Sequence, residues 1–270
     1  MSQLVLGVDV GGSSVKAGAV DVLTGQLIGE LLSAPTPRVS QPEHMRSVLQ
    51  GLAARLPATT GAVGVAFPSV IKRGYVRTAA NLNAGWIGTD GPRFAREALG
   101  RPATFLNDAD AAGLAEMRWG AGRGVMGPVV VVTLGTGIGT ALFSEGRLFP
   151  NTELGHLELH QVDAERWASA RVRTMLKLDW PAWTERVNEY LALLHAFLWP
   201  DLFIIGGAVS ERFAEFASLL RSEAEIRPAR FAGDAGVIGA AIAAAEATPL
   251  GRSQAPLATG QRVGAPICAP

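Results

Sequence analysis

The sequence predicts an α/β protein built from two related halves. Short apolar runs typical of strands alternate with segments in which apolar residues recur at helical spacing, and this alternation is typical of an α/β fold. The order strand, glycine turn, strand occurs twice, in residues 4–21 and again in residues 128–149. The two copies agree in form more than in letters. They indicate two similar halves that each begin with a glycine-hinged hairpin.

The first half continues with helices and strands in alternation. Residues 41–56 carry apolar residues from Met45 to Leu56 at helical spacing, which predicts a helix. The other elements expected here are a strand in "AVGVAFPSV" (62–70), a short helix over 92–99, a strand in "ATFLND" (103–108) and a helix in "ADAAGLAEMRWG" (109–120). The last of these helices begins directly after an Asn-Asp pair, as a capped helix does.

The second half follows the same plan. After its hairpin we expect helices over 164–177 and 181–198, a buried strand in "DLFIIGGAVS" (201–210), a helix in "FAEFASLLRSEA" (213–224) and a small-residue helix in "AGVIGAAIAAAEA" (235–247). We expect a small N-terminal lobe of residues 1–108 plus about 235–247, and a large lobe of residues 109–234. Residues 248–270 are rich in Pro, Gly, Gln and Arg without periodicity and are expected to be disordered.

Composition excludes several classes of protein. The chain has 270 residues, 48% of them apolar, so a sizeable core can form. No run approaches the roughly 18 unbroken apolar residues of a membrane span, and the N-terminus reads as a strand instead of a signal peptide. Lys+Arg and Asp+Glu are both 24, so no global charge draws the chain to nucleic acid or to an anionic membrane. The single cysteine, Cys268, excludes an internal disulfide, and we expect a cytoplasmic protein.

Three glycine clusters follow predicted strands, at Gly11-Gly12, at "GTGIG" (135–139) and at Gly206-Gly207. Such turns let backbone N–H groups converge on an anion, although one glycine pair alone is more often an ordinary hairpin turn. Neither the dinucleotide pattern G-x-G-x-x-G nor the Walker pattern is present in the required context. Asp9 lies just before the first turn, where a carboxylate can hold Mg²⁺, usually through water.

Five motifs together carry a family resemblance. "VDVGGSSVKAGAVD", "NDADAAGLAE", "LGTGIGTALF", "PNTELGH" and "FIIGGAVS" resemble the ROK sugar kinases, over roughly residues 3–246. Within that family they are most similar to the polyphosphate glucokinase and glucomannokinase branch. The resemblance implies the two-lobed, actin-like (ribonuclease H-like) sugar-kinase fold, with the substrate in the cleft between the lobes.

The resemblance also assigns a sugar site. It implies that Asp108 is the catalytic base, with Asn107 beside it, and that Glu153 and His156 hold sugar hydroxyls. Glu165, in "ERWAS", corresponds to a second acid and is the third expected sugar ligand, and Asn81 resembles the asparagine that lies near the sugar. Two neighbours are given other roles: Asp110 is expected to cap the following helix, and Trp86 is either a wall of the site or part of the core.

On the donor side, the resemblance implies a phosphate cradle at the glycine turns. Its expected members are Asp9 with Mg²⁺, Gly11, Gly12, Ser13, Lys16, Thr133, Gly135, Thr136, Gly137, Gly206 and Gly207. The donor is polyphosphate, ATP or both, and Ala208 stands where that branch usually has a third glycine. Polyphosphate also needs a longer basic track, for which Arg118, Arg123, Arg171, Arg173 and Lys177 are candidates, although each is more often an ordinary surface charge.

The stretch "NTELGHLELH" (151–160) raises the alternative of a zinc site. We expect its part "ELGHLELH" (153–160) to alternate as a strand, which places His156 and His160 about 13 Å apart, too far for one zinc ion. ROK proteins typically carry a cysteine-rich zinc motif after the Gly-His pair, and no cysteine lies there in this chain. We therefore expect no zinc.

The expected activity is phosphorylation of the 6-hydroxyl of glucose by a homodimer. Two rival functions are an ATP-dependent kinase for another hexose, such as mannose or an N-acetylated sugar, and a non-catalytic sugar-sensing regulator. The presence of Asp108 favours a kinase over a non-catalytic regulator, because a sugar sensor needs no base at the attacking hydroxyl.

Overall fold

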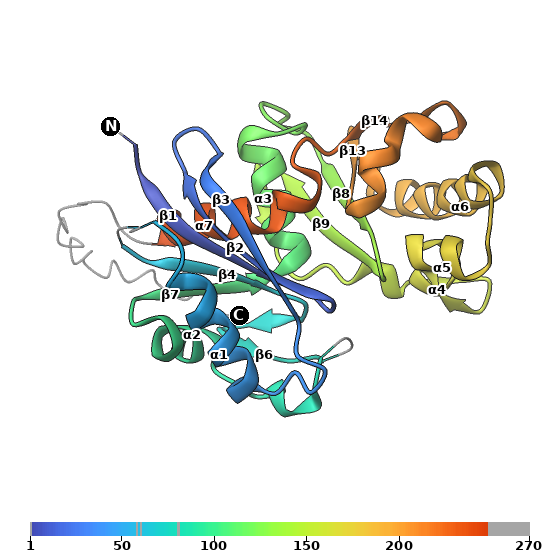
Figure 1. Cartoon of the computed structure of the whole chain (residues 1–270). Helices are drawn as coiled ribbons and strands as arrows, with labels where there is room; N and C mark the ends of the chain where they lie inside the picture. Colours follow the sequence, from blue (N-terminus) through green and yellow to red (C-terminus); the bar gives the residue numbers. More distant parts are fainter. Residues whose placement is uncertain (1, 58, 60, 80–81, 248–270) are drawn as a thin grey trace, which may run out of the picture.

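The computed structural model describes residues 2–57, 59, 61–79 and 82–247, and these residues form two five-stranded sheets of the same topology (Figure 1). The strand orders are β3-β2-β1-β4-β7 and β10-β9-β8-β13-β14. In each sheet an antiparallel hairpin leads to two parallel strands. The prediction of two related halves that open on glycine-hinged hairpins is therefore confirmed. Residues 2–107 are called the first half below, and residues 129–228 the second half.

The first half and the helix that follows it contain β1 (Leu4–Val10), β2 (Ser14–Asp21), β3 (Gln26–Pro35), α1 (Pro42–Ala53), β4 (Val63–Phe67), β5 (Ile71–Lys72), β6 (Tyr75–Val76), η1 (Ala84–Trp86), α2 (Gly91–Leu99), β7 (Ala103–Asn107) and α3 (Asp108–Trp119). The strands β1, β4 and β7 are parallel, so the chain leaves all three at the same edge of the sheet. Gly11, Pro68 and Asp108 therefore come close together.

The second half contains β8 (Val129–Leu134), β9 (Ile138–Ser144), β10 (Arg147–Phe149), η2 (Leu154–His156), β11 (Glu158–Leu159), β12 (Val162–Asp163), α4 (Ala164–Ala168), α5 (Ala170–Met175), α6 (Trp180–Leu198), β13 (Leu202–Gly206), η3 (Ala208–Glu215), η4 (Ala217–Leu219) and β14 (Glu225–Pro228), and it is followed by η5 (Ala232–Asp234) and α7 (Ala235–Ala247). Because β8 and β13 are parallel, the glycine turns after them also share one edge.

Two helices, α3 and α7, lie between the sheets (Figure 1). Helix α7 packs on β1 and β4 of the first sheet, and α3 packs on α7 and on β8 and β9 of the second. Their backbones approach so closely that a Cβ added to Gly239 would lie 1.6 Å from the carbonyl oxygen of Ala111. This contact explains why the last helix is built from glycine and alanine, as its composition predicted.

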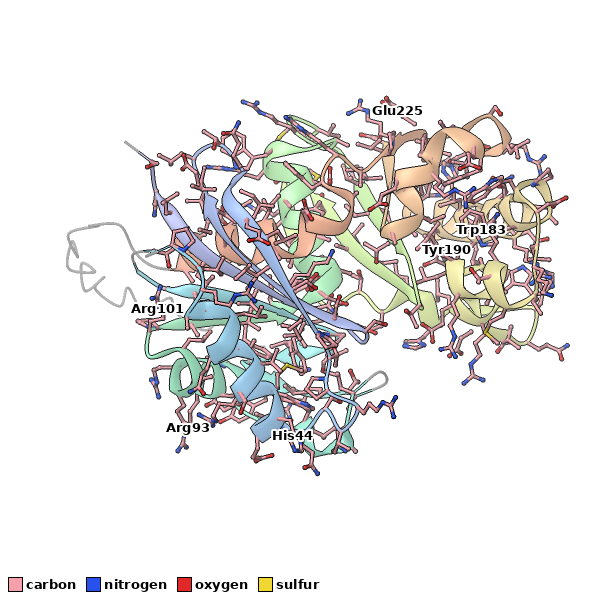
Figure 2. The ribbon with its side chains drawn as sticks, viewed as in Figure 1. His44, Arg93, Arg101, Trp183, Tyr190 and Glu225 are labelled. Carbon is pink, nitrogen blue, oxygen red and sulfur yellow. The ribbon has the colours of Figure 1, made fainter. Side chains whose placement is uncertain are left out.

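The outer faces of the sheets are covered by the remaining helices. Helices α1 and α2 cover the first sheet through a core that includes Met45, Leu49 and Phe94. On the second sheet, α6 buries Trp183 and Tyr190, which are labelled in Figure 2. None of the helices in the described ranges is both long and apolar enough to span a membrane.

Three secondary-structure predictions were wrong. The helix expected over 164–177 is two short helices, because Ser169 has extended backbone and its hydroxyl caps α5. The helix expected over 213–224 is replaced by the 3₁₀ turns η3 and η4. The strand expected over 153–160 is instead η2, the two-residue strand β11, and a turn in which His160 has a positive φ. Residues 248–270, expected to be disordered, lie outside the described residues.

Candidate active site

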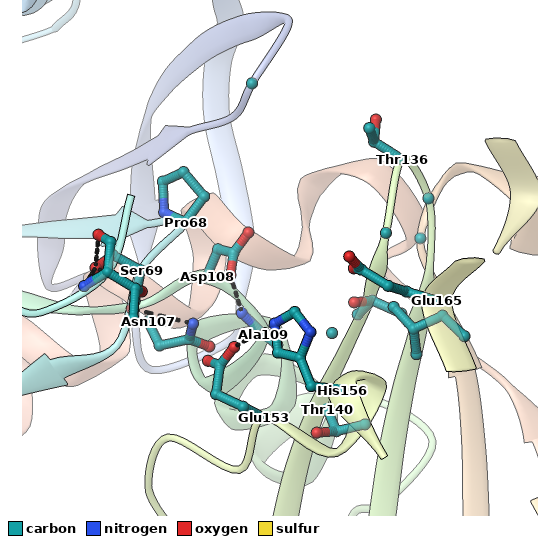
Figure 3. Close-up of a pocket in the computed structure, with 18 of the residues that line it drawn as sticks. Pro68, Ser69, Asn107, Asp108, Ala109, Thr136, Thr140, Glu153, His156 and Glu165 are labelled. Atoms are coloured by element: carbon teal, nitrogen blue, oxygen red, sulfur yellow. Dashed lines mark hydrogen bonds and ion pairs between the residues drawn. The ribbon is translucent and has the colours of Figure 1, made fainter. Parts of the chain in front are cut away.

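A cavity of about 510 Å³ opens where the two halves face each other, at the carboxyl ends of their parallel strands (Figure 3). Its volume suits a small-molecule substrate. The first half contributes Gly12, Ser13, Pro68, Ser69, Thr78 and Asn107, and the start of α3 contributes Asp108 and Ala109. The second half contributes Thr133, Gly135 to Thr140, Thr152, Glu153, His156, Glu165 and Gly207. The lining therefore combines carboxylates, an imidazole and residues of all three glycine turns.

Asp108 is the first residue of α3 and projects into the cavity (Figure 3). Burial, together with the neighbouring Asp9 and Glu153 carboxylates, raises its pKa from 3.8 to about 7, although the Ala109 N–H donates to Oδ1 and opposes the shift. A carboxylate whose pKa lies near neutrality can accept a proton and later release it. Asp108 therefore has the properties that a general base requires.

Asn107 is held in place by two hydrogen bonds. Its Oδ1 accepts from the Asp110 N–H at 3.0 Å and so caps α3, while its Nδ2 donates to the Ser69 carbonyl at 3.2 Å. The prediction that Asp110 caps the helix was wrong, because Asn107 has the extended backbone of the N-cap. Asp110 is instead buried, and its Oδ2 accepts the Asn151 N–H at 2.8 Å.

Glu153, His156 and Glu165 form one cluster on the second-half wall (Figure 3). His156 Nε2 lies 3.7 Å from Glu153 Oε2, and His156 Nδ1 lies 3.2 Å from Asp163 Oδ2. Burial raises the pKa of Glu153, Glu165 raises it further, and His156 opposes the shift. A Cβ added to Gly137 would lie 2.4 Å from Glu165 Oε2, so this carboxylate packs directly against the second glycine turn.

The same cluster contains a set of groups that could hold a cation. Ligand atoms of His156, Asp163 and Glu165 lie within 4.8 Å of one another. The spacing that we used against zinc assumed a strand, and that assumption was wrong. His160 Nε2 is instead 2.9 Å from Glu189 Oε2, and the His160 ring packs on Trp167. The absence of zinc stays a prediction.

The glycine turns at the ends of β1 and β13, together with Thr133 of β8, line a second cavity of about 180 Å³. Asp108, Ala109, Thr133 and Gly207 line both cavities, which are therefore adjacent. Gly207 has φ of +79°, and a Cβ there would lie 2.6 Å from the Leu134 carbonyl oxygen, so only glycine fits. Ala208, the residue that departs from the family pattern, is exposed at the start of η3. This space is suited to phosphate groups beside Asp108.

Asp9 and Lys16 lie at the first-half edge of that second cavity. Burial raises the pKa of Asp9 from 3.8 to about 6, and Lys16 opposes the shift. Lys16 Nζ donates to the Gly233 carbonyl at 2.7 Å, and Gly233 lines the cavity. A cation next to Asp9 would restore the ionised carboxylate that burial disfavours, and hard carboxylate oxygens are the ligands that Mg²⁺ prefers. The residues present therefore fit Mg²⁺.

The five basic candidates do not form one track. Asp108 begins α3 and Trp119 ends it, about 16 Å away along the helix. Arg118 and Arg123 stack on the Trp119 ring, with centroid distances of 5.5 and 5.2 Å, and so lie near the end of α3 that is remote from Asp108. Helix α5 does reach the glycine turns, because the Arg171 N–H donates to the Gly135 carbonyl at 3.0 Å. Arg173 stacks 3.6 Å over Trp180.

Two other sequence candidates have definite outcomes. Trp86 is fully buried against Phe67 and Phe94, and its Nε1 donates to the Ser40 carbonyl at 2.6 Å, so it belongs to the core and is not a wall of the site. Asn81 lies outside the described residues. Sequence reasoning missed Ser69, Thr78 and Thr140, polar residues that line the cavity, and Asp163 beside His156. The only sequence signal for Ser69 is its position just after a strand.

Two sheets of one topology, with a cavity at their facing edges and glycine turns beside Asp108, are the architecture of the two-lobed, actin-like sugar-kinase fold. The ROK family model matches residues 5–167. The chain belongs to the ROK family.

Named relatives are consistent with this assignment. A polyphosphate glucokinase of Mycobacterium tuberculosis is 43% identical over 242 residues, which cover 88% of this chain and 89% of that protein. The structure of an inorganic polyphosphate/ATP-glucomannokinase from Arthrobacter sp. strain KM superimposes with a TM-score of 0.88, at 42% identity, over 91% of this chain and all of that one. A ROK glucokinase from Streptomyces griseus, at 23% identity, covers 90% of this chain and 99% of its own with a TM-score of 0.79 and supports the fold.

Proposed function

We propose that this chain is a glucokinase that transfers a phosphoryl group from inorganic polyphosphate, ATP or both to the 6-hydroxyl of glucose. The observation that carries the proposal is that Asp108, Glu153, His156 and Glu165 line one cavity together with residues of all three glycine turns. The similarity to polyphosphate glucokinases and to a polyphosphate/ATP-glucomannokinase, all above 40% identity, supports the choice of sugar and donor.

In this mechanism Asp108 accepts the proton of the 6-hydroxyl as its oxygen attacks the terminal phosphorus of the donor. The bond from that phosphorus to its bridging oxygen breaks as the new P–O bond forms, and ADP or a polyphosphate chain shorter by one phosphate leaves. Glu153, His156 and Glu165 hold the other hydroxyls, so that the attacking oxygen is fixed beside Asp108. The backbone of the turns at Gly11-Gly12, Ser13, Gly135 to Gly137 and Gly206-Gly207 orients the phosphates, with Thr133 and Lys16 nearby. Asn107 fixes the first turn of α3, which begins with Asp108, by accepting the Asp110 N–H, and it holds the Ser69 segment by donating to the Ser69 carbonyl. Asn81 is proposed as a further sugar contact.

Mg²⁺ is proposed at Asp9, through water. When it is bound, it neutralises charge on the phosphates of the donor. Lys16 supplies a fixed positive charge on the same side, and the two cations would together keep Asp9 ionised.

The rival function is an ATP-dependent kinase for another hexose. The cluster of Glu153, His156 and Glu165 would suit several sugars, because each hexose offers hydroxyls that carboxylates can accept from. A panel of glucose, mannose and N-acetylmannosamine, assayed with each donor, separates the candidates. We expect the highest kcat/KM for glucose, and a preference for an N-acetylated sugar would replace this proposal with its rival.

The activity should fall in acid because the base must be ionised. With both substrates well below saturation, kcat/KM reports the free enzyme, in which the pKa of Asp108 is raised to about 7. We expect kcat/KM to drop about tenfold per pH unit below that value and to level off above it. Because the Glu153 carboxylate contributes to the raised pKa, Glu153→Gln should move the acid limb to lower pH. A profile that stays flat to pH 5 would argue against Asp108 as the base.

Arg171 is the basic residue best placed for a long donor. It is exposed on α5, which touches the Gly135 turn. Polyphosphate extends beyond the turns that ATP phosphates occupy, so Arg171→Ala should raise KM for long polyphosphate several-fold and change KM for ATP little. The effect should shrink at high salt. Arg93→Ala is the matched control, because Arg93 is exposed on α2, over the outer face of the first sheet, and lines neither cavity. Equal losses with both donors would make Arg171 part of the common cradle.

The remaining assignments are proposals of the same kind. We propose a small lobe of residues 1–108 plus about 235–247 and a large lobe of residues 109–234, a homodimer and a cytoplasmic location. Sedimentation analysis of the purified protein tests the dimer.

A further inference from the structure

The side chain of Asn151 joins the two halves next to the cavity. Its Nδ2 donates to the Ile71 carbonyl at 3.0 Å, and its Oδ1 accepts the Ile71 N–H at 2.7 Å. One carboxamide thus satisfies both backbone groups of a residue 80 positions away in the sequence. Asn151 itself does not line either cavity described above, and the mechanism does not use it.

Both partners of this bridge are close to the cavity wall. Ile71 belongs to β5, within residues 69–78. The two ends of this segment are joined by a hydrogen bond that Ser69 Oγ donates to the Thr78 carbonyl at 2.7 Å. Ser69 and Thr78 line the cavity from the first half. On the other side, Asn151 is two residues before Glu153, which lines the cavity from the second half. The bridge therefore ties together two segments that form opposite walls.

The backbone of Asn151 is fixed as well. It has φ of +59°, in the left-handed region, and its N–H donates to Asp110 Oδ2 at 2.8 Å. Asp110 is nearly inaccessible to solvent, and its other carboxylate oxygen has no hydrogen-bond partner. The Asp110 contact holds Asn151 on the start of α3, the helix that begins with Asp108. The base, the Glu153 wall and the Ser69 wall are thereby connected through Asn151.

We propose that Asn151 is a positioning residue that sets the distance between the two walls of the sugar site. This inference rests on the proposed function, because it takes the cavity to be a glucose site. It predicts a change in the KM for glucose and none in the KM for the phosphoryl donor. The donor turns are attached to other strands, and none of the described contacts of Asn151 reaches them.

Asn151→Gly is the test variant. Glycine adopts a positive φ without strain and retains the N–H that binds Asp110, so the substitution removes only the side-chain bridge. Loss of two hydrogen bonds to backbone groups should raise KM for glucose about tenfold, with KM for ATP unchanged within about twofold. The amide hydrogen of Ile71 should also exchange faster with solvent in the absence of substrate, because it loses its acceptor.

Asn188→Ala is the matched control. Asn188 makes the same kind of bridge, donating to the Leu219 carbonyl at 2.9 Å and accepting the Arg221 N–H at 2.8 Å, on the outer side of the second half. Its loss should lower thermal stability but leave KM for glucose unchanged. If Asn151→Gly raised KM for glucose only because the protein is less stable, Asn188→Ala would raise KM for glucose to the same extent. Equal increases in KM in the two variants would therefore overturn the proposal.

Glucose binding by the wild-type protein separates failure of this inference from failure of the proposed function. If wild type binds glucose and Asn151→Gly binds it equally well despite faster exchange at Ile71, the bridge is structural only and the inference is wrong. If wild type does not bind glucose, the proposed function fails, whatever the exchange at Ile71 shows.

Discussion

The Asp108→Asn variant is expected to fold and to bind glucose, but to lose at least about a hundredfold in kcat with either donor. Removal of a general base usually costs two to four powers of ten. The carboxamide has nearly the same shape and can still accept the Ala109 N–H, so the local structure should persist. Steady-state kinetics and glucose binding by calorimetry measure the two effects separately.

The control for this variant is Asp110→Asn. Asp110 is also buried at the start of α3, and burial raises its pKa to about 7, but it faces the Asn151 backbone instead of the cavity. An asparagine oxygen can accept the same N–H, so kcat should stay within about threefold of wild type. If Asp108→Asn retained near-normal kcat, or if Asp110→Asn were the inactive variant, the base would be assigned to the wrong aspartate.

Glu153→Gln should weaken glucose binding by roughly 1.5–3 kcal/mol, the usual range for losing one hydrogen bond to a charged group. This corresponds to a rise of about tenfold to a hundredfold in the dissociation constant for glucose. His156 is 3.7 Å from this carboxylate, and His156→Ala should have an effect in the same range. Glucose titrations of each variant, in the absence of donor, measure these losses directly.

Glu158 provides the control within the same stretch of sequence. It is exposed on β11, and it does not line the cavity. Glu158→Gln should therefore bind glucose as wild type does. If Glu158 were the damaging position and Glu153 the neutral one, the sugar site would have been placed on the wrong side of this segment.

Much of the fold could be predicted because local pattern and tertiary packing agree. The hairpins, the parallel strands after them and helices α1, α2, α3, α6 and α7 all combine periodic apolar residues with turn or cap signals. Strand β3 was not expected, because most of its residues are exposed at the edge of the sheet and its sequence lacks an apolar alternation. Strands β10 and β14 are short edge strands for which the same reason holds.

Tertiary contacts explain the predictions that were wrong. The apolar spacing of residues 213–224 favours a helix, but Asn188 binds the Leu219 carbonyl and the Arg221 N–H, groups that a helix would need for itself. Within the site, motifs brought attention to Glu153, His156, Glu165 and Asp108, which do meet at one cavity. No motif indicated Asp163 beside His156 or Ile71 beside Asn151, because those contacts depend on how loops from distant parts of the chain meet.

Formation of glucose 6-phosphate, measured in parallel with purified polyphosphate and with ATP at saturating glucose and Mg²⁺, tests the central claim most directly. If the chain is a polyphosphate glucokinase, glucose 6-phosphate forms with polyphosphate that contains no nucleotide. If Asp108 is the base, the Asp108→Asn variant loses at least about a hundredfold in kcat under the same conditions. Product with ATP but not with polyphosphate would support the assigned sugar site and exclude polyphosphate as the donor. Absence of glucose 6-phosphate with both donors, from wild-type protein that is folded, would contradict the account.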